Sequence, residues 1–322
     1  MRYVQADTAK PVSVIGLGAW QFGSREWGYG PEYEKRAAEI VRRALELGVT
    51  LFDTAELYAF GRSERILGAA LGDDRDKVFL ASKIFPILPT APVVQQRAVA
   101  SAGRLGVRSI DLYQVHQPNP VVRDRTTMRG MRVLQDVGLV GEVGVSNYGL
   151  KRWRMAEAWL GRRVLSNQVQ YSIAHRAPED DLVPYAERNG RLVIAYSPLA
   201  QGFVSGRYDA KNPPAGAVRR ANPLFLPENL ERGAGLLAAL REVADAHDAT
   251  PSQIALAYLV RNPAVLAIPG ASSVEQLERN AAAADIELAD DEYATLARAA
   301  REFTPITGLA AMPKLIQARR GR

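Results

Sequence analysis

Short apolar runs alternate with amphipathic helical patterns from near the start of this 322-residue chain to near its end. An apolar run of this kind indicates a buried strand, and apolar residues spaced three or four apart indicate a helix packed by one face. About eight strand-then-helix units follow one another, and this repeat predicts a parallel sheet closed on itself, the (β/α)8 TIM barrel. The expected strands are Val12–Gly18, Thr50–Asp53, Val78–Lys83, Ile110–His116, Glu142–Ser146, Leu165–Tyr171, Leu192–Ser197 and Ala264–Pro269.

Helical patterns lie between these strands and continue past the last of them. The pattern over 31–47 has its apolar residues on one face and ends before Gly48, as helices often do. A long segment after the seventh strand, from Leu199 to about Asn229, is punctuated by glycine and proline, which predicts a loop. The expected helices are Pro31–Leu47, Ser63–Leu71, Val93–Leu105, Thr126–Val137, Lys151–Trp159, Asp181–Glu187, Leu230–His247, Pro251–Val260, Ser273–Ala284 and Asp290–Phe303.

No shift in composition divides the chain, so we expect a single domain over 1–322, with a lead-in at 1–11 and a tail at 304–322. The alternative, an open doubly wound sheet that binds a dinucleotide, would need a Gly-x-Gly-x-x-Gly loop opening a helix. The nearest match begins at Gly16, and its third glycine, Gly23, is misplaced. The sequence also lacks a Gly-x-x-x-x-Gly-Lys phosphate loop. A barrel with extra helices and a long loop after strand seven is therefore favoured.

The composition excludes several classes of function. The chain has no cysteine, which excludes disulfides, cysteine-containing zinc sites and thiol nucleophiles. Its formal charge is +6, but the arginines are scattered apart from the tail at 319–322, so we do not expect a nucleic-acid partner. The sequence has neither an apolar run of membrane-spanning length nor an N-terminal signal core. We therefore expect a cytoplasmic protein without a membrane partner, and a monomer by default.

Polar residues or glycines stand at nearly every expected strand end. In a parallel barrel these ends meet at one mouth, where such folds carry their chemistry. Their convergence is difficult to explain by packing alone, so we expect a functional site there. The residues in question are Gly18, Trp20, Asp53, Lys83, His116, Ser146, Asn147, Gln168, Tyr196, Ser197, Gly270 and Ser272.

Four of the side chains near these ends make a candidate catalytic group. Lys83 ends a buried strand, where an ammonium needs a counter-ion, and Asp53 ends the neighbouring strand. His116 ends the next strand, and Tyr58 follows Asp53 by five residues. One histidine and one aspartate are too few ligands for a metal, and the nucleophile elbow of a serine hydrolase is absent. Two mechanisms remain open: Lys83 forms a Schiff base, as in an aldolase, or Lys83 lowers the pKa of Tyr58 so that the phenol donates a proton.

The motifs around these residues resemble the aldo-keto reductase superfamily, from Gly16 to Asn280. The segment from Pro198 to Gly202 and the run that begins at Ser273 look more like the bacterial and potassium-channel β-subunit branches than the mammalian aldose reductases. The matching motifs are Asp53-Thr54-Ala55-Glu56-x-Tyr58, Ser82-Lys83, Asp111 to Pro118, Gly144-Val145-Ser146-Asn147, Asn167 to Tyr171, Tyr196-Ser197-Pro198-Leu199 and Ile268 to Ser272.

This resemblance implies an NADP(H)-dependent reductase that acts on a small carbonyl substrate, and it selects the second mechanism. It implies that Tyr58 is the general acid, that Lys83 lowers its pKa, that Asp53 pairs with Lys83 and that His116 orients and polarises the carbonyl. An alternative within the same resemblance is a redox-sensing NADP(H)-binding module with little turnover. His116 argues against that alternative, because the channel-type proteins resembled carry asparagine there.

The resemblance also implies the cofactor contacts. Ser146, Asn147 and Gln168 would meet the carboxamide of the nicotinamide, and the ring of Tyr196 would stack on it. Arg279 could favour NADP over NAD or could point to solvent, and both remain open. The other expected contacts are Gly18 and Trp20 at the first strand end, Ser197, Pro198, Leu199, Gln201, Gly202, Arg207 and Arg219 on the long loop, and Gly270, Ser272, Gln276 and Asn280 after the last strand.

The sequence departs from the family pattern at Ala19, where threonine is frequent, and at Gln117, where tryptophan or arginine is common. Neither position belongs to the catalytic four. The loops expected to face the substrate are around 20–29 and 85–88, at Tyr148, and in the tail over 303–315. Their residues Trp27, Tyr29, Phe85 and Met312 predict a mainly apolar pocket.

Overall fold

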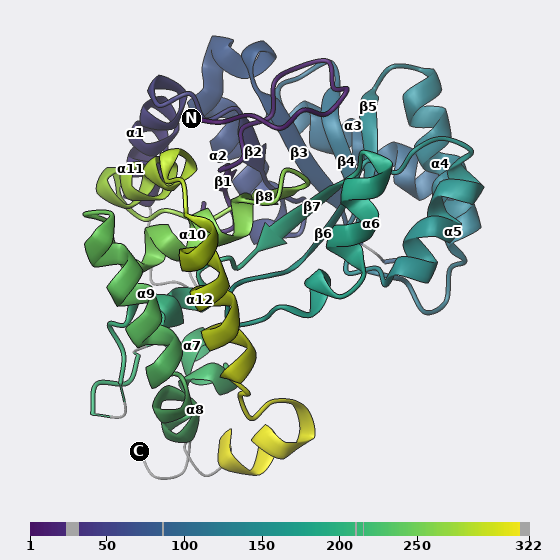
Figure 1. Cartoon of the computed structure of the whole chain (residues 1–322). Helices are drawn as coiled ribbons and strands as arrows, with labels where there is room; N and C mark the ends of the chain where they lie inside the picture. Colours follow the sequence, from purple (N-terminus) through teal and green to yellow (C-terminus); the bar gives the residue numbers. More distant parts are fainter. Residues whose placement is uncertain (24–31, 86, 210, 215, 316–322) are drawn as a thin grey trace.

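The fold of the chain is the barrel expected from its alternating pattern. The computed structural model describes residues 1–23, 32–85, 87–209, 211–214 and 216–315. Eight parallel strands form one sheet in chain order (Figure 1). Their bounds are β1 Leu17–Gly18, β2 Leu51–Asp53, β3 Phe79–Ile84, β4 Ile110–Val115, β5 Val140–Ser146, β6 Ser166–Gln170, β7 Leu192–Tyr196 and β8 Val265–Ala267.

Hydrogen bonds join the two ends of the sheet. Ile15 forms a parallel bridge with Ala267. Gly16 donates its backbone N–H to the Ala267 carbonyl (2.8 Å), and Ala267 donates its own to the Val14 carbonyl (2.9 Å). The sheet therefore closes between β8 and the residues leading into β1, as a barrel requires.

Helices cover the outside of the barrel, and their apolar faces form the main core with the outward-facing strand residues. Beyond the barrel, α9 packs against both α10 and α12 (Figure 1). The helices are α1 Tyr33–Glu46, α2 Arg62–Leu71, α3 Ala91–Leu105, α4 Asp124–Asp136, α5 Leu150–Leu160, α6 Leu182–Asn189, α7 Ala217–Arg220, α8 Pro227–Arg232, α9 Ala234–Ala246, α10 Pro251–Val260, α11 Val274–Ala282 and α12 Asp290–Glu302.

A smaller apolar cluster fills the interior of the barrel and fixes the direction of the site residues. Phe79 and Ala81 of β3 belong to it, as does Leu51 of β2. Because alternate residues of a strand share a face, Lys83 follows Phe79 and Ala81 into the interior, and Asp53 follows Leu51. The two-residue period of the strands thus brings the Lys83 ammonium and the Asp53 carboxylate together above the apolar cluster in the barrel interior.

Three expected elements differ from the structure. The first strand is regular only over Leu17–Gly18, because the residues before it pair singly, as Ser13 does with Tyr3. The helix expected over Leu230–His247 is two helices, α8 and α9, that meet at Gly233. A β-carbon at Gly233 would lie 2.4 Å from the ring of Phe203, so the backbone packs directly on that ring.

The long loop after β7 also contains helical turns. Two short 3₁₀ helices, Ala200–Ser205 and Pro223–Phe225, and the short helix α7 lie within it. Among the residues that the structure describes, no helix is both long and apolar enough to cross a membrane.

Candidate active site

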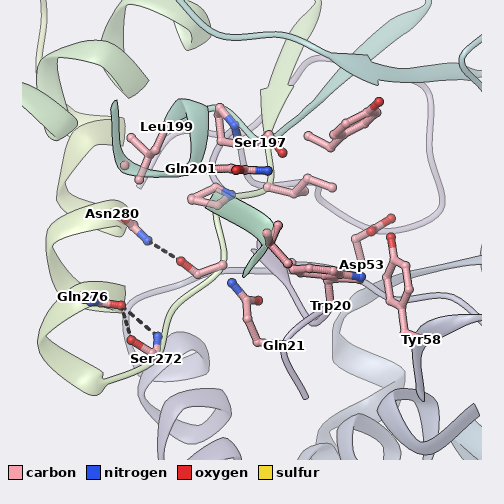
Figure 2. Close-up of a pocket in the computed structure, with 18 of the residues that line it drawn as sticks. Trp20, Gln21, Asp53, Tyr58, Ser197, Leu199, Gln201, Ser272, Gln276 and Asn280 are labelled. Carbon is pink, nitrogen blue, oxygen red and sulfur yellow. Dashed lines mark hydrogen bonds between the residues drawn. The ribbon is translucent and has the colours of Figure 1, made fainter. Parts of the chain in front are cut away.

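A cleft of about 1280 Å³ opens at the carboxyl ends of the strands. All the residues predicted from the sequence to act in catalysis or to bind the cofactor line it, except Lys83, which is buried beneath its floor. Figure 2 shows Asp53, Tyr58 and Trp20 close together at one end of the cleft and Ser272, Gln276 and Asn280 at the other.

Lys83 is the buried centre of the candidate catalytic group. Its side chain is 0% exposed, and that of Asp53 is 2% exposed. Lys83 Nζ donates to Asp53 Oδ1 (2.5 Å), to the Thr54 carbonyl (2.8 Å) and to Tyr58 Oη (3.2 Å). An ammonium has three protons, so each of them has an acceptor. The lysine is thus held in one position by three bonds.

Burial and charge act in opposite directions on the pKa values of Lys83 and Tyr58. Burial lowers the pKa of Lys83, but the Asp53 carboxylate and the Tyr58 oxygen raise it, and the net shift is upward. The lysine therefore keeps its charge. Burial raises the pKa of Tyr58, Lys83 lowers it, and here too the net shift is upward. Lys83 thus acts on the pKa of Tyr58 in the expected direction, but in the chain alone burial outweighs the ammonium, so the pKa is not lowered. A raised pKa nevertheless keeps the phenol protonated at neutral pH, which is the form a proton donor needs.

His116 lies beside Tyr58 as a neutral ring. The two rings meet edge to face, with centroids 5.7 Å apart and planes at 81°. Burial and the nearby charge of Lys83 lower the pKa of His116 to about 3. Its Nδ1 is buried and has no hydrogen-bond partner in the part of the chain that the structure describes. An uncharged imidazole of this kind can bind a ligand oxygen without adding charge to the site.

A strained turn directly follows Tyr58 at the mouth of the barrel. The residues after it, Ala59, Phe60 and Gly61, have φ values of 48°, 53° and 79°. Three successive residues in the left-handed region reverse the chain, and only the glycine adopts that region without strain. The turn leaves Phe60 89% exposed on the rim of the cleft.

Two glutamines complete the environment of Asp53. Gln168 donates from Nε2 to Asp53 Oδ2 (2.8 Å), and Gln114 does so at 3.4 Å. The side-chain amide of Gln168 is therefore bonded to Asp53, whereas the sequence led us to expect it at a nicotinamide. Sequence reasoning missed Gln114, although its position two residues after the inward-facing Leu112 places it on the same, interior face of the strand.

The next strand ends form a connected polar network. Tyr196 donates from its hydroxyl to Asn147 Oδ1 (3.0 Å), Asn147 Nδ2 donates to Ser146 Oγ (3.0 Å), and Ser146 Oγ donates to the Gln168 carbonyl (2.8 Å). Asn147 is held at a positive φ of 60°. The network fixes the wall of the cleft that faces the catalytic group.

The loop after β7 folds over the cleft. Arg219 donates to the Gln201 carbonyl (3.1 Å), and Asn222 donates to Gln201 Oε1 (3.1 Å). Arg207 is exposed and also lines the cleft. The loop thus places two of the predicted arginines, Arg207 and Arg219, on the lining of the cleft.

After β8, the chain forms the far end of the cleft (Figure 2). Ser272 donates from its N–H (2.9 Å) and its hydroxyl (2.7 Å) to Gln276 Oε1, and Asn280 donates to the Gly270 carbonyl (3.3 Å). Gln21, which sequence reasoning missed, packs so closely on Gly270 that a β-carbon there would lie 2.0 Å from its Nε2. Its Oε1 is buried without a partner among the described residues. Its position beside Trp20, at the end of the first expected strand, was the available signal.

The loops expected to face the substrate line the cleft only in part, through Trp20, Gln21 and Gly23. Tyr148 is 1% exposed and donates to Asp124 Oδ1 (2.9 Å), so it belongs to the core and cannot face a substrate. Phe85 and Met312 are not among the described residues that line the cleft, and Trp27 and Tyr29 lie outside the described residues. The apolar rim is instead provided by Leu57 and Phe60, which are 37% and 89% exposed. In the described ranges, no three or more histidine, aspartate or glutamate side chains are grouped so that they could hold a metal ion.

Comparison with known proteins agrees with this architecture. The chain matches the model of the Aldo/keto reductase family over residues 14–301. An uncharacterized oxidoreductase of Mycobacterium tuberculosis is 59% identical over 308 residues, which are 95% of each chain. The methylglyoxal reductase YeaE of Escherichia coli is 34% identical over 284 residues, covering 86% of this chain and 89% of the relative. A solved aldo/keto reductase from Klebsiella pneumoniae, in complex with NADP and acetate, is similar with a TM-score of 0.76 and 31% identity, covering 92% of this chain and 94% of that one.

Proposed function

The chain belongs to the aldo/keto reductase family, and from this premise we propose that it reduces an aldehyde or ketone to an alcohol with NADPH, with Tyr58 as the proton donor. One observation carries the assignment. Tyr58 presents its hydroxyl to the cleft at 3.2 Å from a fully buried ammonium whose other two protons are bonded to Asp53 and Thr54.

The cleft fits a dinucleotide in size and in chemistry. Its volume of about 1280 Å³ exceeds the roughly 300–1,000 Å³ of an ordinary small-molecule site. Four arginines line it, and three of them, Arg207, Arg219 and Arg279, lie on the segments predicted to hold the cofactor and suit phosphate groups. Gln21 Oε1, which has no partner among the described residues, can accept a hydrogen bond from a ligand. When bound, the cofactor supplies a hydride to the carbonyl carbon. The residues proposed to hold it are Gly18, Trp20, Ser146, Asn147, Gln168, Tyr196, Ser197, Pro198, Leu199, Gln201, Gly202, Arg207, Arg219, Gly270, Ser272, Gln276, Arg279 and Asn280.

The chain's own residues then handle the proton. Tyr58 donates from Oη to the carbonyl oxygen as that oxygen gains negative charge, so the donor stabilises the transition state more than the ground state. The phenolate left behind is stabilised by the Lys83 ammonium at 3.2 Å until solvent returns a proton. Asp53 keeps Lys83 charged. The neutral His116 ring orients the carbonyl by a hydrogen bond.

The same geometry disfavours the Schiff-base mechanism that the sequence left open. A lysine must be neutral and accessible to attack a carbonyl carbon. Lys83 is 0% exposed, all three protons of its ammonium group are donated in hydrogen bonds, and its pKa is raised. Borohydride reduction with substrate present should therefore leave Lys83 unmodified.

The assignment is tested by following NADPH oxidation with nitrobenzaldehyde and methylglyoxal as probes. Tyr58→Phe should lower kcat by about 10²- to 10⁴-fold, the usual size of a general-acid contribution, and leave NADPH binding intact. Tyr3→Phe, at an exposed tyrosine that is not among the residues lining the cleft, is the matched control. Normal turnover in Tyr58→Phe would disprove the proton-donor role. Tight NADPH binding with negligible turnover of the parent on a broad carbonyl panel would instead support the redox-sensing module.

A further inference from the structure

The chain does not stop pairing with β3 when β2 ends. Thr54 donates its N–H to the Ala81 carbonyl (2.9 Å), and Glu56 donates its own to the Lys83 carbonyl (3.3 Å). These bonds repeat every two residues, as in a parallel ladder. By the same register, the next bond would run from the Phe85 N–H to the main-chain carbonyl of residue 56.

A side chain takes that place. The Phe85 N–H donates to Glu56 Oε1 at 2.6 Å. The main chain is therefore free to leave the ladder, and Tyr58 donates its N–H back to the Ala55 carbonyl (3.1 Å) at the start of the turn. The ladder ends two residues before the phenol that lies over Lys83.

Charges hold the Glu56 carboxylate in position. Its Oε2 accepts from Arg97 of α3 at 3.0 Å, and Arg104 lies 3.9 Å away. Arg104 also bonds Glu64, which accepts from Ser82 beside Lys83. Glu56 is only 6% exposed, and an acid buried to this degree needs such partners. The two carboxylate oxygens of Glu56 thus have different partners: Oε1 accepts a hydrogen bond from the Phe85 N–H, and Oε2 faces the two arginines.

We propose that Glu56 is a positioning residue for the proton donor: its carboxylate replaces a main-chain acceptor at Phe85 and so sets the point from which Tyr58 turns back over Lys83. This proposal rests on the role proposed above for Tyr58. It predicts that the acceptor at residue 56, rather than its charge, controls the placement of the phenol.

A pair of double variants separates acceptor from charge. Both carry Arg97→Gln, at a side chain that is 39% exposed, and they differ only in Glu56→Gln or Glu56→Ala. Neither member has the ion pair, but only glutamine offers an oxygen to Phe85. We expect kcat within about threefold of the parent for the glutamine variant and about 10- to 100-fold lower for the alanine variant, since a misplacement of about 1 Å can have an effect of this size. The KM for NADPH should be unchanged in both.

Amide hydrogen exchange of the peptide over 54–61 gives a second readout that needs no catalysis. The alanine variant should exchange faster there than the parent, and the glutamine variant should not. Equal kcat and equal exchange in the two variants would overturn the proposal. If the parent lacks reductase activity, the proposed function fails, and the exchange comparison still decides whether Glu56 holds the turn. If the alanine variant does not fold, a folded glutamine variant with kcat lowered 10-fold or with fast exchange at 54–61 would equally refute the proposal.

Discussion

Removing the charge of Lys83 should destabilise the protein and inactivate it, and the two effects should be separable. Lys83→Met leaves the Asp53 carboxylate, 2% exposed, without its cation. Breaking a buried pair on one side costs roughly 3–5 kcal/mol. Asp53 keeps the hydrogen bond from Gln168 (2.8 Å), so we expect the lower end, about 3 kcal/mol. With about 2.1 cal/mol/K of unfolding entropy per residue over 322 residues, this is a fall in Tm of about 4 °C.

The double variant Asp53→Asn with Lys83→Met supplies the decisive comparison. It removes both charges, so most of the lost stability in urea or thermal unfolding should return. Its activity should not return, because Tyr58 still lacks the neighbouring ammonium. A single variant that loses less than about 1 kcal/mol, or a double variant as unstable as the single one, would refute the buried-pair reasoning. Recovery of turnover in the double variant would refute the role of Lys83 at Tyr58.

Two further outcomes follow from His116 and Phe60. The folded pKa of His116 is about 3, below the ordinary value near 6.5, so the unfolded chain gains a proton first as pH falls, and stability decreases. Between about pH 7 and pH 5 the free energy of unfolding should fall by roughly 2 kcal/mol for this reason. In His116→Gln, urea unfolding measured across this pH range should lack that loss. The same pH dependence in the variant and the parent would contradict the buried neutral ring. Phe60→Ala should raise the KM for nitrobenzaldehyde by about tenfold, the value of partly burying a phenyl ring, and leave methylglyoxal little affected. An equal change for both aldehydes would argue against ring contact with the substrate.

The sequence predicted the barrel and the mouth because both follow from strand periodicity. A two-residue period fixes which side chains face inward, so the proximity of Asp53 and Lys83 follows from the strand pattern alone. The helix break at Gly233 was not predictable, because it depends on the ring of Phe203 from a distant segment. The same holds for Tyr148, whose aromatic character suits a rim and a core equally until Asp124 is seen beside it.

The sign of the Tyr58 pKa shift was missed for a related reason. Charge partners can be guessed from neighbouring strand ends, but burial depends on how the whole turn packs. The ladder bond of Glu56 is equally invisible in sequence, since a glutamate after a strand is usually a solvated helix cap or surface residue. Only the register of β2 on β3 shows that its carboxylate stands where a carbonyl would be.

Backbone strain gathers at the mouth, and its distribution bears on which side chains act there. Left-handed conformations at non-glycine residues cost about 1–2 kcal/mol each, and glycine would relieve them. At Asn147 and Gln201 the strain is explained by side chains that hold the site together. Asn147 accepts a hydrogen bond from Tyr196 (3.0 Å), and Gln201 accepts one from Asn222 (3.1 Å). Phe60 is different, because it is strained and yet 89% exposed, so packing does not account for a phenyl group at that position. Its place on the cleft rim does, if the ring covers an apolar substrate that binds beside Tyr58.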